Sequence, residues 1–202
     1  MGTIAIIDYG AGNTRSVLYA LRRLGREAVV TADPRAIRRA ERVIFPGVGH
    51  AASAMERLKE KELDTLLPTL TQPVLGICLG LQLMCRHTDE GDIPGLGIFD
   101  AEVHHFRREG EATRSLRIPH MGWNSVHTRG SRLLQDVDDD SYFYFVHSYY
   151  AAVAPQTTAI TEYGISFSAI MEKENFFATQ FHPEKSGKVG ERVLRNFLNL
   201  KE

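Results

Sequence analysis

The sequence has few cysteines, no long apolar run and no excess of charge of either sign, and each absence excludes a class of protein. Two cysteines in 202 residues exclude a disulfide-dense extracellular scaffold. No segment approaches the roughly 18 consecutive apolar residues that indicate a membrane-spanning helix. The 24 basic and 25 acidic side chains nearly cancel. This balance argues against nucleic-acid binding or membrane anchoring through bulk charge.

The two cysteines and the first residues indicate a reducing compartment. Cys78 and Cys85 lie seven residues apart in one stretch with a helical pattern, which suits neither a disulfide nor a pair of metal ligands. The opening MGTIAIIDYGAGN lacks a basic segment, and its apolar run stops at Asp8. We therefore expect no signal peptide and a cytoplasmic location.

The length and the order of the elements predict one α/β domain over residues 1–202. In the first half, short apolar segments alternate with helical patterns, as in a mostly parallel central sheet that is flanked by helices. The expected strands are 3–8, 27–32, 42–47 and 73–78, and the expected helices are 13–25, 34–40, 51–70 and 79–87.

The second half changes character. Its segments are short, rich in β-branched or aromatic residues and separated by turn residues, which predicts antiparallel strands added to the sheet. These segments are AEVHHF, NSVHT, YFYFVHSYYAAV, TAITEY, FSAIMEK and FFATQF, and an amphipathic helix is expected over 189–200.

The segment GICLGLQ (76–82) is the strongest chemical signal. A buried strand leads directly into Cys78 and then into a helix, which is the layout of a nucleophile elbow. Gly76 and Gly80 stand two residues to either side, where a side chain would collide with neighbouring backbone. The helix N-terminus beneath the sulfur favours the thiolate. Taken alone, the pattern also fits a buried structural cysteine.

A second signal, FHPEKS (181–186), follows an apolar strand. His182 and Glu184 are two residues apart, so in extended backbone their side chains project to the same side, and Pro183 favours that conformation. Glu184 would orient the imidazole while His182 moves protons to and from a thiol. A surface turn is the ordinary interpretation of such a tripeptide on its own.

Together, GICLGLQ and HPEKS resemble the triad pattern of the class I glutamine amidotransferases. Further blocks, DYGAGN (8–13), FPGVGH (45–50), PHMGWN (119–124) and YFVHSYY (144–150), are similar in their order to the glutaminase subunits of imidazole glycerol phosphate synthases. These blocks span nearly the whole chain. The resemblance implies a flavodoxin-like α/β fold, glutamine hydrolysis, and a (β/α)8-barrel cyclase subunit as heterodimer partner in histidine biosynthesis.

The resemblance also implies roles for individual residues, and it implies no cofactor and no metal. Cys78 would be the nucleophile, with His182 as general base and acid and Glu184 as its orienting carboxylate. Glycines 47 and 49 would free the backbone around Val48 for an oxyanion donor. The remaining implied residues are Leu79 for the oxyanion hole; Gly49, Gly80, Gln82, Ser148 and Tyr149 for glutamine; and Asn13, Tyr144 and Lys185 for the partner.

Other functions remain open at this point. The chain could be a glutaminase that serves anthranilate, aminodeoxychorismate or pyridoxal phosphate synthase, although the PGVG turn and PHMGWN favour the first assignment. A cysteine peptidase or an inactive binding module of the same fold are further alternatives. The DYGAGN turn lacks the third glycine of a dinucleotide loop, so we expect it at the rim of the active site and not around a phosphate. His104, His105, His120 and His127 have no metal-ligand spacing.

Overall fold

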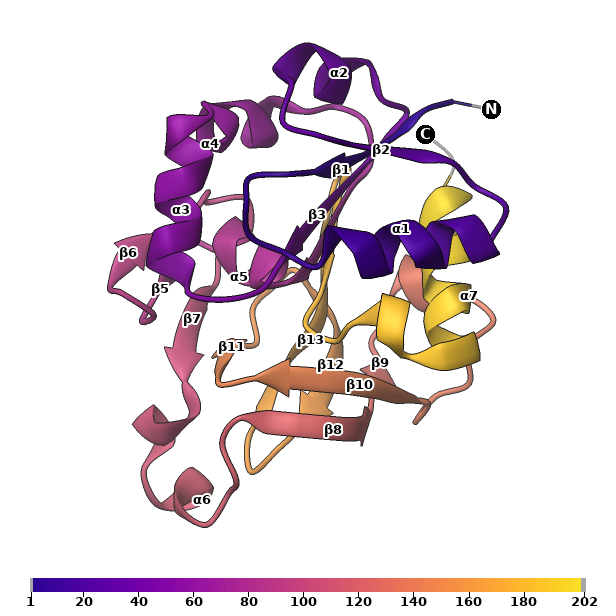
Figure 1. The fold of residues 1–202 in the computed structure, drawn as a ribbon. Coiled ribbons are helices and arrows are strands. Elements are labelled where there is room, and N and C mark those ends of the chain that lie inside the picture. Colours follow the sequence, from indigo (N-terminus) through magenta and orange to yellow (C-terminus); the bar gives the residue numbers. More distant parts are fainter. Residues whose placement is uncertain (1, 201–202) are drawn as a thin grey trace.

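The structure is a computed structural model that describes residues 2–200, and one large mixed sheet runs through it (Figure 1). The strand order is β2-β1-β3-β4-β14-β13-β12-β9. The pairings from β2 to β14 are parallel, and those from β14 to β9 are antiparallel. This arrangement confirms the predicted fold class, including the antiparallel strands in the second half. The strands of this sheet are β1 (Ile4–Ile7), β2 (Ala28–Thr31), β3 (Arg42–Gly47), β4 (Val74–Cys78), β9 (His127–Thr128), β12 (Thr157–Glu162), β13 (Ser166–Lys173) and β14 (Phe176–Thr179).

Helices cover both faces of the parallel part. Alternate residues of β1 belong to different cores, Ala5 and Ile7 to one and Ile4 and Ile6 to the other. A strand that is buried on both faces is mostly apolar, which is why β1, β4 and the part of β3 after Arg42 are continuous apolar runs. Figure 1 shows α1 and α7 on one side of the sheet and α3, α4 and α5 on the other. The helices are α1 (Thr14–Arg23), α2 (Pro34–Arg39), α3 (Ala51–Glu60), α4 (Leu63–Leu66), α5 (Leu79–Met84), α6 (Glu111–Arg114) and α7 (Gly187–Leu198).

Two predicted helices differ from the expectation: the one over 51–70 is divided into α3 and α4 near Glu62, which has φ 55°, and another is shorter than expected. The pattern over 79–87 predicts a single helix, but α5 ends at Met84 and residues 87 and 88 form a short strand. The carbonyls of Leu83 and Met84 accept hydrogen bonds from the backbone N–H groups of Leu96 and Ile98 at 2.7 and 2.9 Å. A distant loop thus takes the acceptors that a further helical turn would need.

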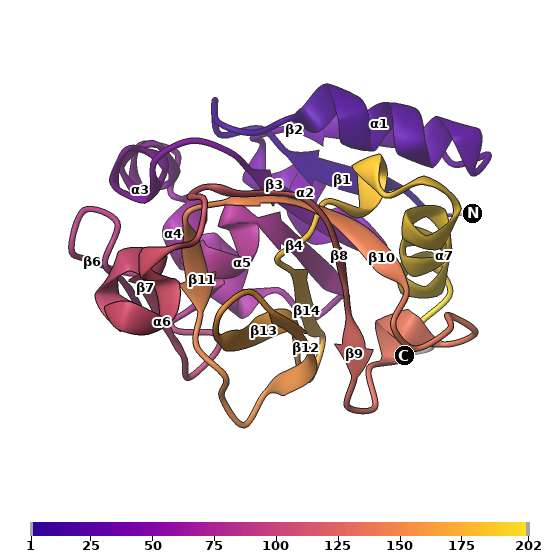
Figure 2. The same ribbon diagram turned by 90° about the horizontal axis from the view of Figure 1, so that it is seen from below.

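The remaining strands form two small sheets. A four-stranded sheet has the order β11-β7-β5-β6, and β8 pairs antiparallel with β10 in a two-stranded ribbon. In Figure 2 this ribbon runs between β7 and α7. Two predicted strands are each divided, NSVHT between β8 and β9, and 142–153 between β10 and β11 at Ser148. The strands are β5 (His87–Thr88), β6 (Ile93–Pro94), β7 (Glu102–His105), β8 (His120–Ser125), β10 (Tyr142–His147) and β11 (Tyr149–Ala151).

Within residues 2–200, no helix has the length and apolar character needed to cross a membrane.

Candidate active site

Cys78 occupies the sharp turn between β4 and α5, with φ 56° and ψ −107°. Residues other than glycine rarely adopt this backbone conformation, and such backbone strain is concentrated at functional sites. Close packing holds the turn in place: a side chain at Gly80 would come within 2.1 Å of the carbonyl oxygen of Phe45 on β3. The predicted elbow and the need for glycine at position 80 are both confirmed.

The sulfur of Cys78 has polar neighbours from two other segments. Its Sγ lies 3.9 Å from the carbonyl oxygen of Val146 at the end of β10, and 3.7 Å from Nε2 of Gln180. Cys78 is only 7% exposed, but it lines a pocket. A largely buried cysteine at the wall of a pocket suits attack on a bound substrate.

His182 and Glu184 form a buried pair at the end of β14. His182 Nδ1 lies 2.8 Å from Oε1 of Glu184, and both side chains are almost completely buried. The expected contact is present, and His182 has the expected extended backbone, but the extended conformation does not continue to Glu184. Residues Pro183–Lys185 form a 3-10 turn, because Lys185 and Ser186 donate to the carbonyls of His182 and Pro183.

The charge on His182 depends on its neighbours. Burial lowers its pKa, but the charge and hydrogen bonding of Cys78, followed by those of Glu184, outweigh that effect and raise the pKa from 6.5 to about 10. Within residues 2–200, Nε2 of His182 has no partner that meets hydrogen-bond geometry, although Cys78 is near enough to affect its pKa. This nitrogen is therefore available for proton exchange with the thiol or with a ligand beside it.

A pocket of about 310 Å³ opens over Cys78 and His182. Small-molecule sites usually have volumes of about 300–1,000 Å³, so this pocket suits a small ligand. Six residues implied by the resemblance line it: Val48, Gly49, Leu79, Gln82, Ser148 and Tyr149. Gly80 does not, since it packs against β3 behind the turn.

Two side chains give the pocket a polar end. Gln82 uses its Nε2 to donate to the carbonyl of Tyr149 at 2.8 Å and to Oε1 of Gln180 at 3.1 Å. Its own Oε1 is the atom that is left for a ligand. Glu90 also lines the pocket, and one of its oxygens accepts from the backbone N–H of Ala51 at 2.8 Å. An amide oxygen and a carboxylate together can accept hydrogen bonds from an ammonium group.

The two glycines of the PGVG turn lie in different surroundings. Gly47 pairs with Cys78 and is tightly packed, since a side chain there would come within 2.8 Å of the Tyr9 hydroxyl and of Leu79. Gly49 has φ +103° and open space around it. Gly49 therefore has a backbone conformation that favours glycine, whereas Gly47 is a glycine because its surroundings leave no room for a side chain.

The residues expected at the partner surface lie on neighbouring elements. The ammonium of Lys185 lies 5.9 Å from the ring centre of Tyr144, and the rings of Tyr144 and Trp123 are 6.2 Å apart. Asn13 caps α1, accepting from the backbone N–H of Ser16 at 3.2 Å. The turn before it is close to the PGVG segment, because a side chain at Gly12 would be 3.0 Å from the carbonyl of Pro46.

Sequence reasoning missed several residues around the pocket. Glu90, Pro119 and His147 line it, and Gln180 contacts the nucleophile behind it. Glu90 belongs to a turn with no motif of its own, so no local signal was available. Gln180 did carry a signal, because a glutamine at the end of the apolar segment FFATQF needs buried partners.

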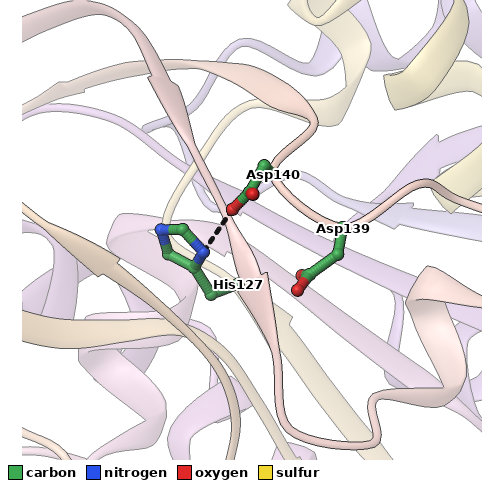
Figure 3. Close-up of side chains that lie close together, drawn as sticks. All are labelled: His127, Asp139 and Asp140. Atoms are coloured by element: carbon green, nitrogen blue, oxygen red, sulfur yellow. Dashed lines mark ion pairs between the residues drawn. The ribbon is translucent and has the colours of Figure 1, made fainter.

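The histidines that lack metal-ligand spacing have separate environments. His120 is buried against His147, whereas His127 lies with Asp139 and Asp140 (Figure 3). His127 Nδ1 is 2.5 Å from Asp140, and Asp139 accepts from the backbone N–H of Thr128 at 2.9 Å. Spacing along the chain gave no sign of this cluster. Its groups already have protein partners and are solvent-exposed, so it is a surface ion pair of small energetic weight, about 0–1 kcal/mol.

Comparison with known proteins identifies the family of this chain. Residues 5–200 match the family model described as glutamine amidotransferase class-I. The chain is 53% identical over 197 residues to the imidazole glycerol phosphate synthase subunit HisH of Bacteroides thetaiotaomicron, covering 98% of this chain and 99% of that one. It is 48% identical over 199 residues to the subunit of the same name from Pectobacterium atrosepticum, with the same coverage.

Solved structures give a more distant similarity. A crystal structure of a glutamine amidotransferase superposes with a TM-score of 0.73 at 18% identity, covering 96% of both chains. The structure of PurLQS from Thermotoga maritima gives 0.70 at 16% identity, covering 98% of this chain and 99% of the matched chain. At these identities the similarity concerns the fold.

Proposed function

This chain belongs to the class I glutamine amidotransferase family, and from that premise we propose that it is the glutaminase subunit of an imidazole glycerol phosphate synthase. The observation that carries the proposal is the meeting of Cys78, on its strained elbow, with the buried His182–Glu184 pair in one small pocket. Full-length identity of 53% to a subunit of that synthase supports the choice among glutaminases.

In the proposed reaction, Sγ of Cys78 attacks the side-chain carboxamide carbon of glutamine. His182 delivers a proton to the nitrogen as the C–N bond breaks, so ammonia leaves and a thioester remains. A water molecule then loses a proton to His182 and attacks the thioester carbon. The C–S bond breaks with its electron pair on Sγ, glutamate leaves, and the proton that His182 took from water is again shared between His182 and Cys78 as in the starting state.

Glu184 acts on this cycle through His182. Its Oε1, 2.8 Å from Nδ1, holds the ring so that Nε2 faces the pocket, and its charge stabilises the imidazolium. The raised pKa of His182 keeps the imidazole protonated near pH 7, so the proton needed by the leaving nitrogen is already in place.

The pocket supplies groups for the rest of glutamine. Oε1 of Gln82 and the carboxylate of Glu90 suit the α-ammonium, and backbone groups of Ser148 and Tyr149 suit the α-carboxylate. Leu79 is the first residue of α5, so its N–H has no acceptor within that helix and can serve the oxyanion. A second donor would come from the Val48–Gly49 segment.

The ribbon of β8 and β10 supports a protein partner. Met121, Trp123 and Tyr142 are 58%, 55% and 60% exposed on its outer face. Val146 continues this face to the pocket, beside Cys78. Exposed apolar patches of this kind mark interaction sites. A (β/α)8-barrel cyclase that covered this face, with Asn13, Tyr144 and Lys185 at its border, would receive ammonia directly.

The test uses the complex with the cyclase subunit. Cys78→Ala should abolish product formation from glutamine, while added ammonia should still be used, because free ammonia bypasses the thioester. Cys85→Ala is the matched control, since Cys85 is a buried structural cysteine outside the pocket. Retained glutamine hydrolysis in Cys78→Ala would exclude the mechanism. Failure of the chain to bind the cyclase would exclude this synthase.

A further inference from the structure

Gln180 is a polar side chain with no solvent exposure, and both ends of its amide are engaged beside the nucleophile. Its Oε1 accepts from Nε2 of Gln82 at 3.1 Å, and its Nε2 lies 3.7 Å from Sγ of Cys78. We propose that Gln180 is a further catalytic residue, which donates a hydrogen bond to the Cys78 thiolate and holds it for attack. The proposal depends on the proposed function only for the identity of the nucleophile.

The direction of the Gln180 amide follows from a backbone carbonyl. The oxygen of Tyr149 can only accept hydrogen bonds, so the Gln82 atom at 2.8 Å from it must be the amide nitrogen. The same nitrogen faces Gln180, which must therefore present its oxygen. The Gln180 nitrogen then faces the sulfur. Reversing either amide would place two donors or two acceptors against each other.

A buried histidine pair holds that carbonyl from the other side. His147 Nδ1 donates to the Tyr149 oxygen at 2.7 Å, so Nε2 of the neutral ring accepts from Nδ1 of His120 at 3.0 Å. His120 Nε2 accepts in turn from the amide of Asn124 at 3.3 Å. The hydrogen bonds therefore run in one direction, from Asn124 through His120 and His147 to the carbonyl oxygen of Tyr149. Burial lowers the pKa values of His120 and His147 to about 4 and about 3, so both rings stay neutral near pH 7 and the direction is maintained.

The two polar contacts of the sulfur favour different protonation states. The Val146 carbonyl, at 3.9 Å, accepts from the neutral thiol and repels a thiolate. The Gln180 N–H is a weak partner for a thiol and a strong one for a thiolate, because hydrogen bonds to charged groups are stronger. Gln180 therefore compensates for the carbonyl when Cys78 loses its proton.

The experiment measures the reactivity of the Cys78 sulfur as its rate of alkylation by iodoacetamide, from about pH 5 to about pH 10. It uses the full chain carrying Cys85→Ala, so that Cys78 is the cysteine that reacts. Gln180→Met keeps the length of the side chain and removes both polar ends. We expect alkylation near pH 7 to fall about tenfold and its pH profile to move about one unit higher, as for loss of one hydrogen bond to a charged group. Glutamine turnover in the cyclase complex should fall by a similar factor, with ammonia-dependent synthesis unchanged.

Two further variants make the result decisive. Gln180→Glu retains the acceptor for Gln82 and is nearly isosteric, but it places an oxygen at the sulfur. It should move the alkylation profile in the same direction and further, and it remains informative if Gln180→Met does not fold. Gln72→Met removes an amide that donates to the carbonyl of Ile37 far from the thiol, and it should leave the profile in place.

An unchanged alkylation profile in folded Gln180→Met or Gln180→Glu would overturn the proposal and leave Gln180 with a structural role. This outcome is separate from failure of the proposed function. A wild-type chain that hydrolyses no glutamine with the cyclase would contradict the proposed function, whereas the alkylation profile needs no glutamine.

Discussion

At the scale of single residues, the site depends on side chains that are buried before any substrate arrives. Glu184 has both oxygens inside the protein: Oε1 contacts His182, and Oε2 has no hydrogen-bond partner among residues 2–200. Holding a carboxylate in this state is costly unless a nearby cation compensates it. A protonated His182 supplies that charge, so burial of the Glu184 carboxylate depends on the presence of His182.

The first prediction concerns this pair in the cyclase complex. His182→Ala should lower kcat for glutamine by about 10⁴-fold or more, because in the proposed reaction His182 moves the proton in both steps. Glu184→Gln should retain more activity, with a loss of about 10²-fold, because an amide oxygen can still orient Nδ1. It should also move the alkaline limb of the pH profile to lower pH, since His182 would lose a charge that raises its pKa.

Steady-state kinetics across pH measure both effects, and thermal melts check the fold. A Glu184→Gln variant with full activity and an unchanged profile would remove Glu184 from the mechanism.

At the scale of elements, the β8–β10 ribbon has two different faces. Its outer face carries the exposed Met121, Trp123 and Tyr142, while its inner face carries Phe143, Phe145 and the facing pair His120 and His147. The period of two along a strand produces this division. The ribbon therefore joins the proposed partner surface on one side to a neutral histidine pair beside the candidate active site on the other.

The histidine pair predicts a loss of stability in acid. An unfolded histidine binds a proton near pH 6.5, but burial lowers the pKa of His120 to about 4 and that of His147 to about 3 in the folded chain. Between these values the unfolded state binds more protons, so the free energy of unfolding falls as pH falls from 6.5 toward 4. We expect a loss of about 3 kcal/mol for each histidine across that window, or roughly 6 kcal/mol for the pair, from about 1.4 kcal/mol per pKa unit.

Urea unfolding at a series of pH values from about 7 down to about 4 measures this loss in the free energy of unfolding. His147→Asn retains a donor for the Tyr149 carbonyl and should flatten the curve. His182 does not obscure the result: its folded pKa is raised to about 10, so its contribution is complete below pH 6.5 and is lost only as pH rises toward 10. An equally steep curve in His147→Asn would assign the acid sensitivity elsewhere.

At the scale of the whole molecule, the proposed partner surface and the oxyanion segment are contiguous. The turn before Asn13 packs against Pro46, which is two residues before Val48. A partner that contacts this turn can thus favour one orientation of the Val48–Gly49 peptide, provided that its contacts differ between the two orientations. An isolated subunit that lacks one oxyanion donor would be slow.

The last prediction is weak glutaminase activity in the isolated chain and an increase of about 10²–10³-fold with the cyclase subunit and its nucleotide ligand bound. Gly49→Ala should reduce this increase, because φ +103° is strained for any side chain, while complex formation by titration stays unchanged. Gly130→Ala is the matched control, with φ +95° in open space and no place in the pocket. Equal rates with and without the partner would refute the switch and leave the Cys78 chemistry intact.

Much of the fold could be predicted because its signals are local. Buried parallel strands are mostly apolar on both faces, so β1, β4 and the part of β3 after Arg42 are recognisable as continuous apolar runs. The elbow at Cys78 is recognisable because an apolar strand leads directly into a cysteine that has a glycine two residues to either side and a helix after it. Both constraints act within a few residues of the chain, and the sequence by itself determined them.

Only the tertiary structure decided what surrounds the sulfur. The pairing of β14 with β4 brings Gln180 to Cys78 across 102 positions, and the packing of the β8–β10 ribbon brings Val146 there across 68; no local pattern encodes either contact. The end of α5 was decided in the same way, by a loop that takes its carbonyls. Backbone sterics and burial act on neighbouring residues, whereas the hydrogen-bond partners of a buried polar atom depend on which segments the completed fold brings together.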